Sequence, residues 1–330
     1  MPRFIIHHVT KYTYAEPVRD SANQIMLFPL HDQYQELMSQ QLVITGYPNI
    51  ERYIDYYGNE TGTFMYLDAH SELLIDSKIE IVTKPRLMPV VDIAIDKQWE
   101  YLEQIKYIVP FIDFLKQETF HSITEVKEIT DPQFCKKYSV FEAAERLNEY
   151  VFQNFQYIKG VTNTETTVDE IWKLKAGVCQ DFAHVLLLML RNINIPARYV
   201  SGYVCPLDKD LRGEGATHAW VEAYIPFYGW LGLDPTNNCV VNDLHVRLAI
   251  GRSFMDCSPV KGTYKGTAKQ VLEVGVSVSY EDGIAPMKLN TTLKAQPQPL
   301  TANANNNNPT SNSYRLHVEM QKQQQQQQQQ

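Results

Sequence analysis

A helix-length apolar run in the middle of the chain predicts a buried helix. From Phe182 to Leu190 every residue except His184 is apolar, as in a helix that is enclosed on all sides. Pro196 and the strand-forming residues after it end this helix and begin a strand. Cys179 comes directly before the run and after a glycine turn, so the pattern places a cysteine at the helix N-terminus. Unpaired N–H groups and the helix dipole favour negative charge there, and therefore the reactive thiolate.

Two segments downstream of this helix predict a β-hairpin. Residues 217–225 alternate in polarity as a strand does. Residues 230–234 form a second strand, which Pro235 ends. The four residues between the strands include a proline and a glycine, as connections between strands often do.

The register of this hairpin decides which side chains share a face. If Ile225 pairs with Gly229 across a three-residue loop, the two strands extend from that pair. Trp220 then lies opposite Asp234. His218 is diagonal to Asp234 on the same face, with Cβ atoms about 7–8 Å apart. A two-residue turn would put His218 and Asp234 on opposite faces, so the prediction depends on the looser loop or on a bulge.

The first 84 residues carry short strand-like segments and predict a small β-sandwich. Glycine and asparagine in residues 57–62 are typical of a hairpin turn. His7 and His8 are neighbours on a strand and point to opposite faces, so they do not suit one metal ion. We interpret this region as a scaffold or a substrate-binding module. The candidate strands are Phe4–Tyr14, Gln24–Phe28, Leu37–Thr45, Glu51–Tyr57, Thr63–Leu67 and Ser71–Thr83.

Helices are expected between this region and the core strands. Residues 85–138 predict a linker and a helical segment over 96–118, interrupted near Pro110. Capping-box patterns over 139–142 and 167–170 each precede a further helix. Helices followed by antiparallel strands indicate an α+β core.

The C-terminal part changes character twice. We expect residues 139–280 to form the core, with 240–267 as loop containing one short helix. Val271–Tyr280 alternates as a strand that completes a sheet in the core or reaches back to the N-terminal sheet. Residues 281–330 are rich in Asn and Gln and cannot bury enough apolar area to offset chain entropy, which predicts disorder. Aggregation or partner binding through Gln323–Gln330 is the alternative.

Three of these motifs resemble the catalytic core of the transglutaminase-like superfamily in its bacterial branch. They are Cys179 after Gly-Val, His218 in His-Ala-Trp on a strand, and Asp234 in Asp-Pro-Thr at the end of the next strand. The resemblance implies that Cys179 is the nucleophile, His218 the general base and acid, and Asp234 the group that orients the imidazole. Other segments that look like this group are Ile195–Tyr203, Gly251–Asp256, Tyr12–Val18 and Asp55–Asn59.

The resemblance implies a fold and a reaction. We expect an N-terminal β-sandwich followed by a papain-like, transglutaminase-like core, in which the helix with the nucleophile packs on an antiparallel sheet. The reaction would be acyl transfer at an amide bond through a thioester, by a peptidase or amidase, or by a transglutaminase. Hydrolysis is favoured because transfer to an amine requires that water be excluded. The alternative is a non-catalytic binding module that keeps the fold.

The oxyanion and the acid next to the nucleophile raise two further questions. The Cys179 backbone N–H and an upstream donor would hold the oxyanion, and Tyr157 and Trp172 are the candidates for that donor. Asp181 stabilises the first helical turn, but its charge would oppose a thiolate close by. Partial exposure or a salt bridge to Arg198 would remove this objection, and plain helix capping is the favoured role.

A zinc site is the main chemical alternative to the triad. Cys179, His184, His218 and Asp234 are all permissible ligands. Cys179 and His184 are five residues apart, about 140° round a helix axis, and the chain has no Cys-x-x-Cys or His-x-x-x-His pair. We therefore expect no metal and no other cofactor.

The composition of the chain narrows the possible binding partners and the possible cellular location. The chain has 330 residues and a formal net charge of −8, with no basic block, which argues against a nucleic-acid partner. No apolar run approaches membrane-spanning length, and the N-terminus lacks the apolar core of a signal peptide. Five cysteines without paired spacing fit a reducing compartment, so we expect a cytoplasmic protein. The expected partner is a peptide or protein amide substrate; the oligomeric state is open.

Overall fold

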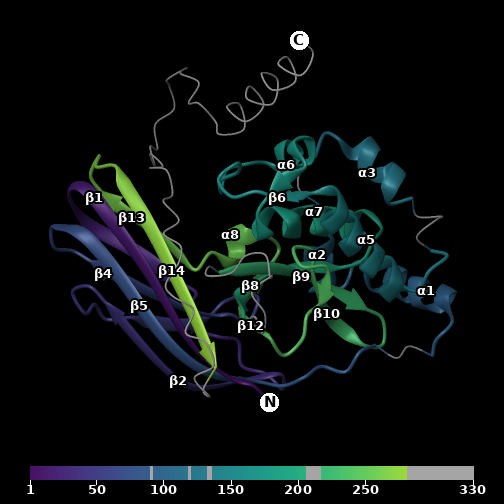
Figure 1. Ribbon diagram of the computed structural model, residues 1–330, viewed down its shortest axis with the longest axis horizontal. Coiled ribbons are helices and arrows are strands. Elements are labelled where there is room, and N and C mark those ends of the chain that lie inside the picture. Colours follow the sequence, from purple (N-terminus) through teal and green to yellow (C-terminus); the bar gives the residue numbers. More distant parts are fainter. Residues whose placement is uncertain (90–91, 118–119, 132–135, 206–216, 281–330) are drawn as a thin grey trace, which may run out of the picture. The chain divides into compact units, whose positions relative to one another are not determined.

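A single long strand, β1 (Arg3–Ile25), organises the first part of the chain in the computed structural model (Figure 1). The structure describes residues 1–89, 92–117, 120–131, 136–205 and 217–280. These form two compact units: residues 1–88, 200–219 and 241–280 make the first, and residues 89–199 and 220–240 make the second. The unit boundaries fall inside strands β8 (Ala197–Val204) and β9 (His218–Ile225).

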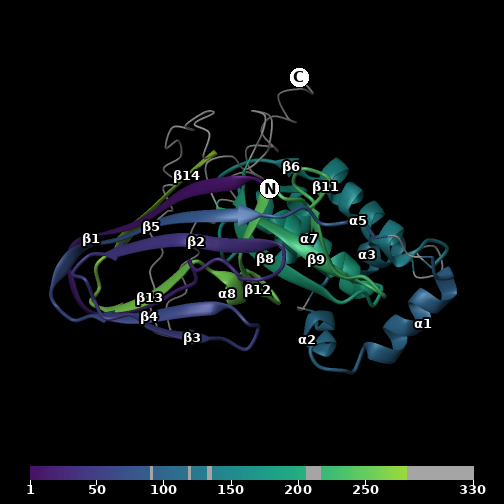
Figure 2. The ribbon, with the colours of Figure 1, turned by 90° about the horizontal axis from the view of Figure 1, so that it is seen from below.

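The first unit is a curled β-sheet built around β1. Strand order is β2-β5-β1-β4-β3, and β13 and β14 also pair with β1. The first half of β1 pairs with β5 and β14, and its second half pairs with β4 and β13. Figure 2 shows the resulting two layers, which agrees with the predicted sandwich. The other elements of this unit are β2 (Gln35–Ile44), β3 (Glu51–Ile54), β4 (Glu60–Tyr66), β5 (His70–Thr83), β12 (His245–Gly251), α8 (Phe254–Cys257), β13 (Val260–Lys265) and β14 (Gln270–Tyr280).

Alternation along β1 gives this unit its core. Phe4 and Ile6 are fully buried, while Ile5 between them is 43% exposed, because successive side chains point to opposite faces. His8 continues the buried row and is satisfied there, since its Nδ1 lies 2.8 Å from the Tyr203 hydroxyl. The two layers that β1 joins therefore enclose one apolar core.

The predicted hairpin turn in this unit is confirmed. β3 and β4 pair from Ile54 opposite Glu60. The Asp55 carboxylate accepts hydrogen bonds from the backbone N–H groups of Tyr57 and Asn59. Gly58 between them has φ +87°, a conformation that glycine adopts without a steric penalty.

Two expectations for this unit are corrected. Gln24–Phe28 is not a separate strand, because β1 continues to Ile25 and irregular chain follows. Residues 240–267 are not a loop with one helix, because they also hold β12 and β13. β14 takes the second of its two predicted places, since it pairs with β1 over Phe4–Tyr14. The tail from residue 281, predicted to be disordered, lies outside the described residues.

The second unit holds the described helices other than α8, and most of the hairpin. The strands belong to an antiparallel sheet of order β11-β10-β9-β8-β12, and both ribbon views place α7 beside β9 (Figures 1 and 2). No helix within the described ranges is long and apolar enough to cross a bilayer. The elements are α1 (Ile95–Ile105), α2 (Phe111–Leu115), α3 (Ile123–Ile129), α5 (Val140–Asn154), β6 (Gln156–Tyr157), α6 (Val168–Leu174), β7 (Ala176–Gly177), α7 (Cys179–Asn192), β10 (Gly229–Asp234) and β11 (Cys239–Val240).

Local sequence explains where these helices begin. Ser139 before α5 and Thr167 before α6 each form the predicted capping box with the Glu three residues later. α7 contacts α5 and α6 and is buried along most of its length, as the apolar run predicts.

Candidate functional site

Cys179 is the first residue of α7, as predicted. It is 9% exposed and carries a free thiol. The chain reaches it through β7 and Val178, whose extended backbone forms the N-cap of the helix. The sulfur therefore lies where the first N–H groups of a buried helix are unpaired, which favours an anionic sulfur.

Asp181 caps this helix and is not paired with Arg198. Its Oδ2 accepts hydrogen bonds from the Val178 backbone N–H at 2.7 Å and from the Thr162 hydroxyl at 2.6 Å. Arg198 instead pairs with Glu222 at 2.6 Å, and Asp181 is 1% exposed, so neither a salt bridge to Arg198 nor partial exposure is present. The favoured role, helix capping, is confirmed. Burial raises the pKa of Asp181 to about 6, and the two hydrogen bonds oppose this effect.

Gly177 is required by the position of that carboxylate. A Cβ atom at residue 177 would lie 2.4 Å from Oδ2 of Asp181 and 2.7 Å from its Cβ. Asp181 is only 1% exposed, so its side chain has little freedom to move aside. Gly177, two residues before Cys179, thus makes room for the Asp181 side chain in the first turn of the helix.

Tyr157 interacts electrostatically with Cys179 and with Asp234 at the end of the hairpin. β6 and β7 are parallel and align Tyr157 with Gly177, and the tyrosine ring packs edge-on against Phe182. Burial raises the pKa of Tyr157, and Cys179, Asp181 and Asp234 add to this electrostatically. The phenol therefore stays protonated and keeps a hydrogen to donate.

Trp172, the other predicted oxyanion donor, is already engaged. Its indole N–H donates to Oε2 of Glu125 at 2.6 Å, and the Lys175 ammonium lies 3.1 Å from the centre of its ring. Burial lowers the pKa of Lys175 to about 8, and Glu125 opposes this shift. Tyr157 is the better supported of the two candidates.

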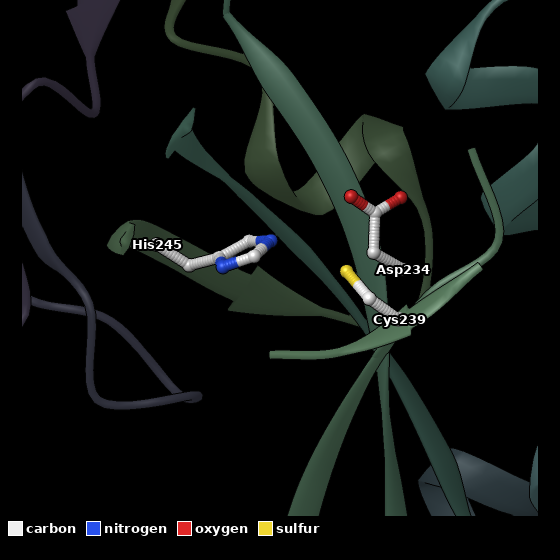
Figure 3. Close-up of side chains that lie close together, drawn as sticks. All are labelled: Asp234, Cys239 and His245. Atoms are coloured by element: carbon white, nitrogen blue, oxygen red, sulfur yellow. The ribbon is translucent and has the colours of Figure 1, made fainter. Parts of the chain in front are cut away.

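Asp234 is fully buried at the end of β10, and its carboxylate is held by the following turn. Oδ1 accepts from the backbone N–H groups of Thr236 and Asn237, and Oδ2 accepts from the Asn237 side-chain amide at 2.8 Å. Figure 3 shows Cys239 of β11 beside Asp234. The Cys239 sulfur and a carboxylate oxygen lie within 4.8 Å of each other. Burial, and next the Asp234 charge, raise the pKa of Cys239 to about 12, so this thiol stays protonated. His245, also labelled in Figure 3, belongs to the first unit.

The hairpin has the predicted register. Ile225 pairs with Gly229 and Val221 with Leu233, so the next pair places Trp220 opposite Asp234. His218 is the first residue of β9 and is 2% exposed. Because side chains alternate along a strand, His218 and Trp220 share the face of Asp234.

The loop geometry explains this register. Ile225 and Gly229 pair across residues 226–228, so the connection is the looser loop and not a two-residue turn, and Phe227 and Gly229 have φ values of +66° and +106°. This is the register on which the predicted placement of His218 relative to Asp234 depends.

The remaining members of the zinc alternative are placed differently. His184 lies within α7 with its ring 5.3 Å from that of Tyr199. Burial, and next the Arg191 charge, lower the pKa of His184 to about 4, so the imidazole is neutral. We interpret His184 as a core residue of the helix.

Two polar neighbours of this site were not found from the sequence. Thr162 lies in an irregular segment far upstream of Asp181, and no spacing rule links the two. Cys239 follows the Asp-Pro-Thr motif in a region predicted to be loop. Pairing of β10 with β11, Asp234 opposite Cys239, is what brings it to the site.

Comparisons with known proteins identify the family. Residues 106–235 match the model of the transglutaminase-like superfamily, and residues 4–82 match that of the bacterial transglutaminase-like N-terminal region. An uncharacterized protein of Mycobacterium tuberculosis is 30% identical over 297 residues, covering 86% of this chain and 94% of that protein. The chain belongs to the transglutaminase-like superfamily. Its matched core holds all three predicted site residues, Cys179, His218 and Asp234.

Further relatives of this transglutaminase-like protein support the same family and fold. An uncharacterized protein of Mycobacterium leprae is 29% identical over 282 residues, 84% of this chain and 99% of that protein. The crystal structure of a proposed cysteine protease from Cytophaga hutchinsonii has the same fold, with a TM-score of 0.66 and 22% identity over 89% of this chain and 96% of that one. A protein-glutamine gamma-glutamyltransferase of Pseudomonas aeruginosa is 35% identical over 80 residues, 23% of this chain and 12% of that enzyme. The family is one of cysteine-based enzymes.

Proposed function

We propose that this protein is an acyl-transfer enzyme that attacks amide bonds of peptides or proteins with Cys179. The observation that carries the proposal is the free thiol of Cys179 at the N-terminus of a buried helix, within the matched family core that also holds Asp234. The two residues come from the start of α7 and the end of β10, and the hairpin register supports His218 as the third member of the set.

In the proposed reaction the Cys179 thiolate attacks the amide carbonyl carbon. The C–N bond then breaks, and the His218 imidazolium gives its proton to the departing amine. The acyl group is held as a thioester on Cys179. Neutral His218 next removes a proton from the water or amine that attacks the thioester, and the thiolate leaves.

Asp234 is proposed to hold the His218 ring in the useful tautomer and to stabilise its cationic form. This role requires a carboxylate with a fixed direction. The hydrogen bonds from the 236–237 turn and the Asn237 amide supply that constraint.

The oxyanion is proposed to receive hydrogen bonds from the Cys179 backbone N–H and the Tyr157 hydroxyl. Loss of one such donor typically raises the barrier by about 2.7–4 kcal/mol. Since the raised pKa keeps the phenol protonated, Tyr157 can donate throughout the neutral range. Tyr157→Phe should therefore slow acylation of Cys179 by roughly 10²–10³-fold.

Hydrolysis is proposed as the main second step, because water is always present and transfer to an amine requires its exclusion. Transfer to an amine is the second candidate, favoured by the similarity to the glutamyltransferase of Pseudomonas aeruginosa. A cytoplasmic location is proposed with it, since Cys179, Cys205, Cys239 and Cys257 are all free. Fractionation of cells that express the tagged protein would test the location.

Acylation by p-nitrophenyl acetate tests the proposal directly. We expect a rapid release of p-nitrophenol equal to the enzyme present, and an acetyl group on Cys179 by mass spectrometry. Cys179→Ala should abolish the burst, whereas Cys205→Ala, which changes a fully buried thiol, should keep it. A burst that survives in Cys179→Ala, or none in the native protein, would refute catalysis and favour the binding module. Adding dansylcadaverine and casein separates transfer from hydrolysis, because only transfer makes the casein fluorescent.

A further inference from the structure

We infer that Asp181 is a positioning residue: its carboxylate holds Val178, and through Val178 it sets the direction of the Cys179 backbone N–H toward the oxyanion. The inference rests on the proposed function, because it names how one of the two proposed oxyanion donors is held. It assigns to the acid in the helix turn a role beyond capping.

The Asp181 side chain holds the N–H of Val178, and backbone N–H groups of the first helical turn hold its carbonyl. The Val178 N–H donates to Oδ2 of Asp181 at 2.7 Å. The Val178 carbonyl accepts from the backbone N–H groups of Asp181 and Phe182, at 2.9 and 3.1 Å. This carbonyl and the Cys179 N–H belong to one planar peptide group. Fixing the carbonyl therefore fixes the opposite direction for the N–H of Cys179.

Thr162 ties this arrangement to the chain upstream. Its hydroxyl donates to the same Oδ2 atom at 2.6 Å, so a single carboxylate oxygen holds both the Val178 residue and the segment after β6. Tyr157, the other proposed oxyanion donor, ends β6. Asp181 thus connects the backbone of one proposed donor to the segment that follows the other.

The fit of Gly177 shows that the site is built around this carboxylate. Any side chain at residue 177 would fall within 2.4–2.8 Å of three atoms of Asp181. An aspartate that only capped the helix could turn toward solvent, as exposed caps do. This one is buried, accepts two hydrogen bonds on one oxygen and excludes a Cβ from the preceding turn.

Two reactions of Cys179 distinguish this positioning role from a general disturbance of the site. Alkylation by iodoacetamide displaces iodide at a saturated carbon and develops no oxyanion, so it reports only on the thiolate. Acylation by p-nitrophenyl acetate passes through a tetrahedral oxyanion and needs both donors. A misdirected Cys179 N–H should therefore slow acylation and leave alkylation nearly unchanged.

The experiment measures both rates in Asp181→Ala, Asp181→Asn, Thr162→Val and Thr162→Ser. We expect Asp181→Ala to slow acylation about 10²-fold, the usual effect of a small misplacement in an active site. Asp181→Asn keeps an acceptor oxygen and should retain most of the rate. Thr162→Val should slow acylation less than Asp181→Ala, and Thr162→Ser should restore it.

Asp169→Ala is the matched control. Asp169 is also an acid in the first turn of a helix, α6, and accepts backbone hydrogen bonds from His121 and Ser122. Its loss should leave the ratio of acylation to alkylation as in the native protein. If Asp181→Ala does not fold, Asp181→Asn and the Thr162 pair carry the test.

Two results would overturn the inference. One is acylation at the native rate in folded Asp181→Ala, or in Thr162→Val if Asp181→Ala does not fold. The other is an equal fall of acylation and alkylation, which would mean that Asp181 acts on the thiolate and not on the N–H. Both differ from failure of the proposed function, in which the native protein and Cys179→Ala would show the same acylation.

Discussion

Replacement of Asp181 by asparagine should change how stability depends on pH. Asp181 is 1% exposed, and burial raises its pKa from 3.8 to about 6. The folded state therefore binds the proton more tightly than the unfolded chain does. The stabilisation is complete below about pH 4 and is lost as the pH rises through 6. The difference between the two pKa values corresponds to about 3 kcal/mol in the free energy of unfolding.

Urea unfolding of the native protein and Asp181→Asn, between about pH 4 and pH 7.5, measures this effect. Asparagine cannot ionise, so its free energy of unfolding lacks this contribution. We expect the asparagine variant to gain about 3 kcal/mol relative to the native protein over this range. Comparing the two proteins at each pH cancels the titration of all other groups.

Asp169→Asn provides a control of opposite sign. Burial is the largest single influence on Asp169 and raises its pKa, but the hydrogen bonds from His121 and Ser122 together lower it below the ordinary value. Its stabilisation is therefore present at neutral pH and lost in acid, so the asparagine variant should lose stability relative to the native protein as the pH rises. A flat or falling difference for Asp181→Asn would refute the reasoning, since the carboxylate would then not be desolvated as the structure shows.

Three further substitutions test the packing around the site. Gly177→Ala should destabilise the protein by roughly 1–3 kcal/mol. In a double-mutant cycle measured by urea unfolding, the destabilisation by Gly177→Ala should be smaller when Asp181→Ala removes the clashing carboxylate. If the effects of the two substitutions simply add, the contact between the two residues is contradicted. Glu222→Ala removes a fully buried carboxylate from the partly buried Arg198 guanidinium and should cost about 3–5 kcal/mol in guanidinium unfolding, whereas a loss below about 1 kcal/mol would mean a solvated pair. Ser139→Ala removes a capping box and should cost about 1 kcal/mol by thermal unfolding; an unchanged midpoint would contradict it.

The sequence predicted those parts of the site that depend on local rules. The start of α7 at Cys179 follows from a glycine turn before an apolar run. The register of the hairpin follows from the loop length, because one pairing, Ile225 with Gly229, fixes all the others. It is this local rule that places His218 on the face of Asp234.

The parts of the fold that the sequence analysis did not predict depend on residues that lie far apart along the chain. β12 contains Arg247, which is 5% exposed and breaks the apolar pattern of a buried strand. Its charge is paired with Asp32, and its backbone N–H and carbonyl both bond to the Gln35 side chain. These partners precede it by more than 200 residues, so no window along the chain reveals them.

Arg198, considered from the sequence as a possible partner of Asp181, pairs elsewhere for a related reason. It lies on β8 next to β9, where Glu222 presents a carboxylate at 2.6 Å. An antiparallel neighbour strand offers a better partner than a helix terminus, because pairing holds the two side chains on one face. Asp181 was thereby left without a cation, and its burial raises its pKa.

A buried acid with no cation beside it lowers the stability of the folded protein. This loss of stability bears on why Asp181 lies beside Cys179. At neutral pH its carboxylate is ionised at a cost, and a neutral side chain that filled the same space would avoid it. Capping alone does not require that cost, since Ser or Thr caps a helix without a charge, as Ser139 and Thr167 do here. What a carboxylate adds is a strong acceptor that can hold the Val178 N–H and the Thr162 hydroxyl on one oxygen. Stability lost at a site where geometry matters is the usual sign of a constraint set by function.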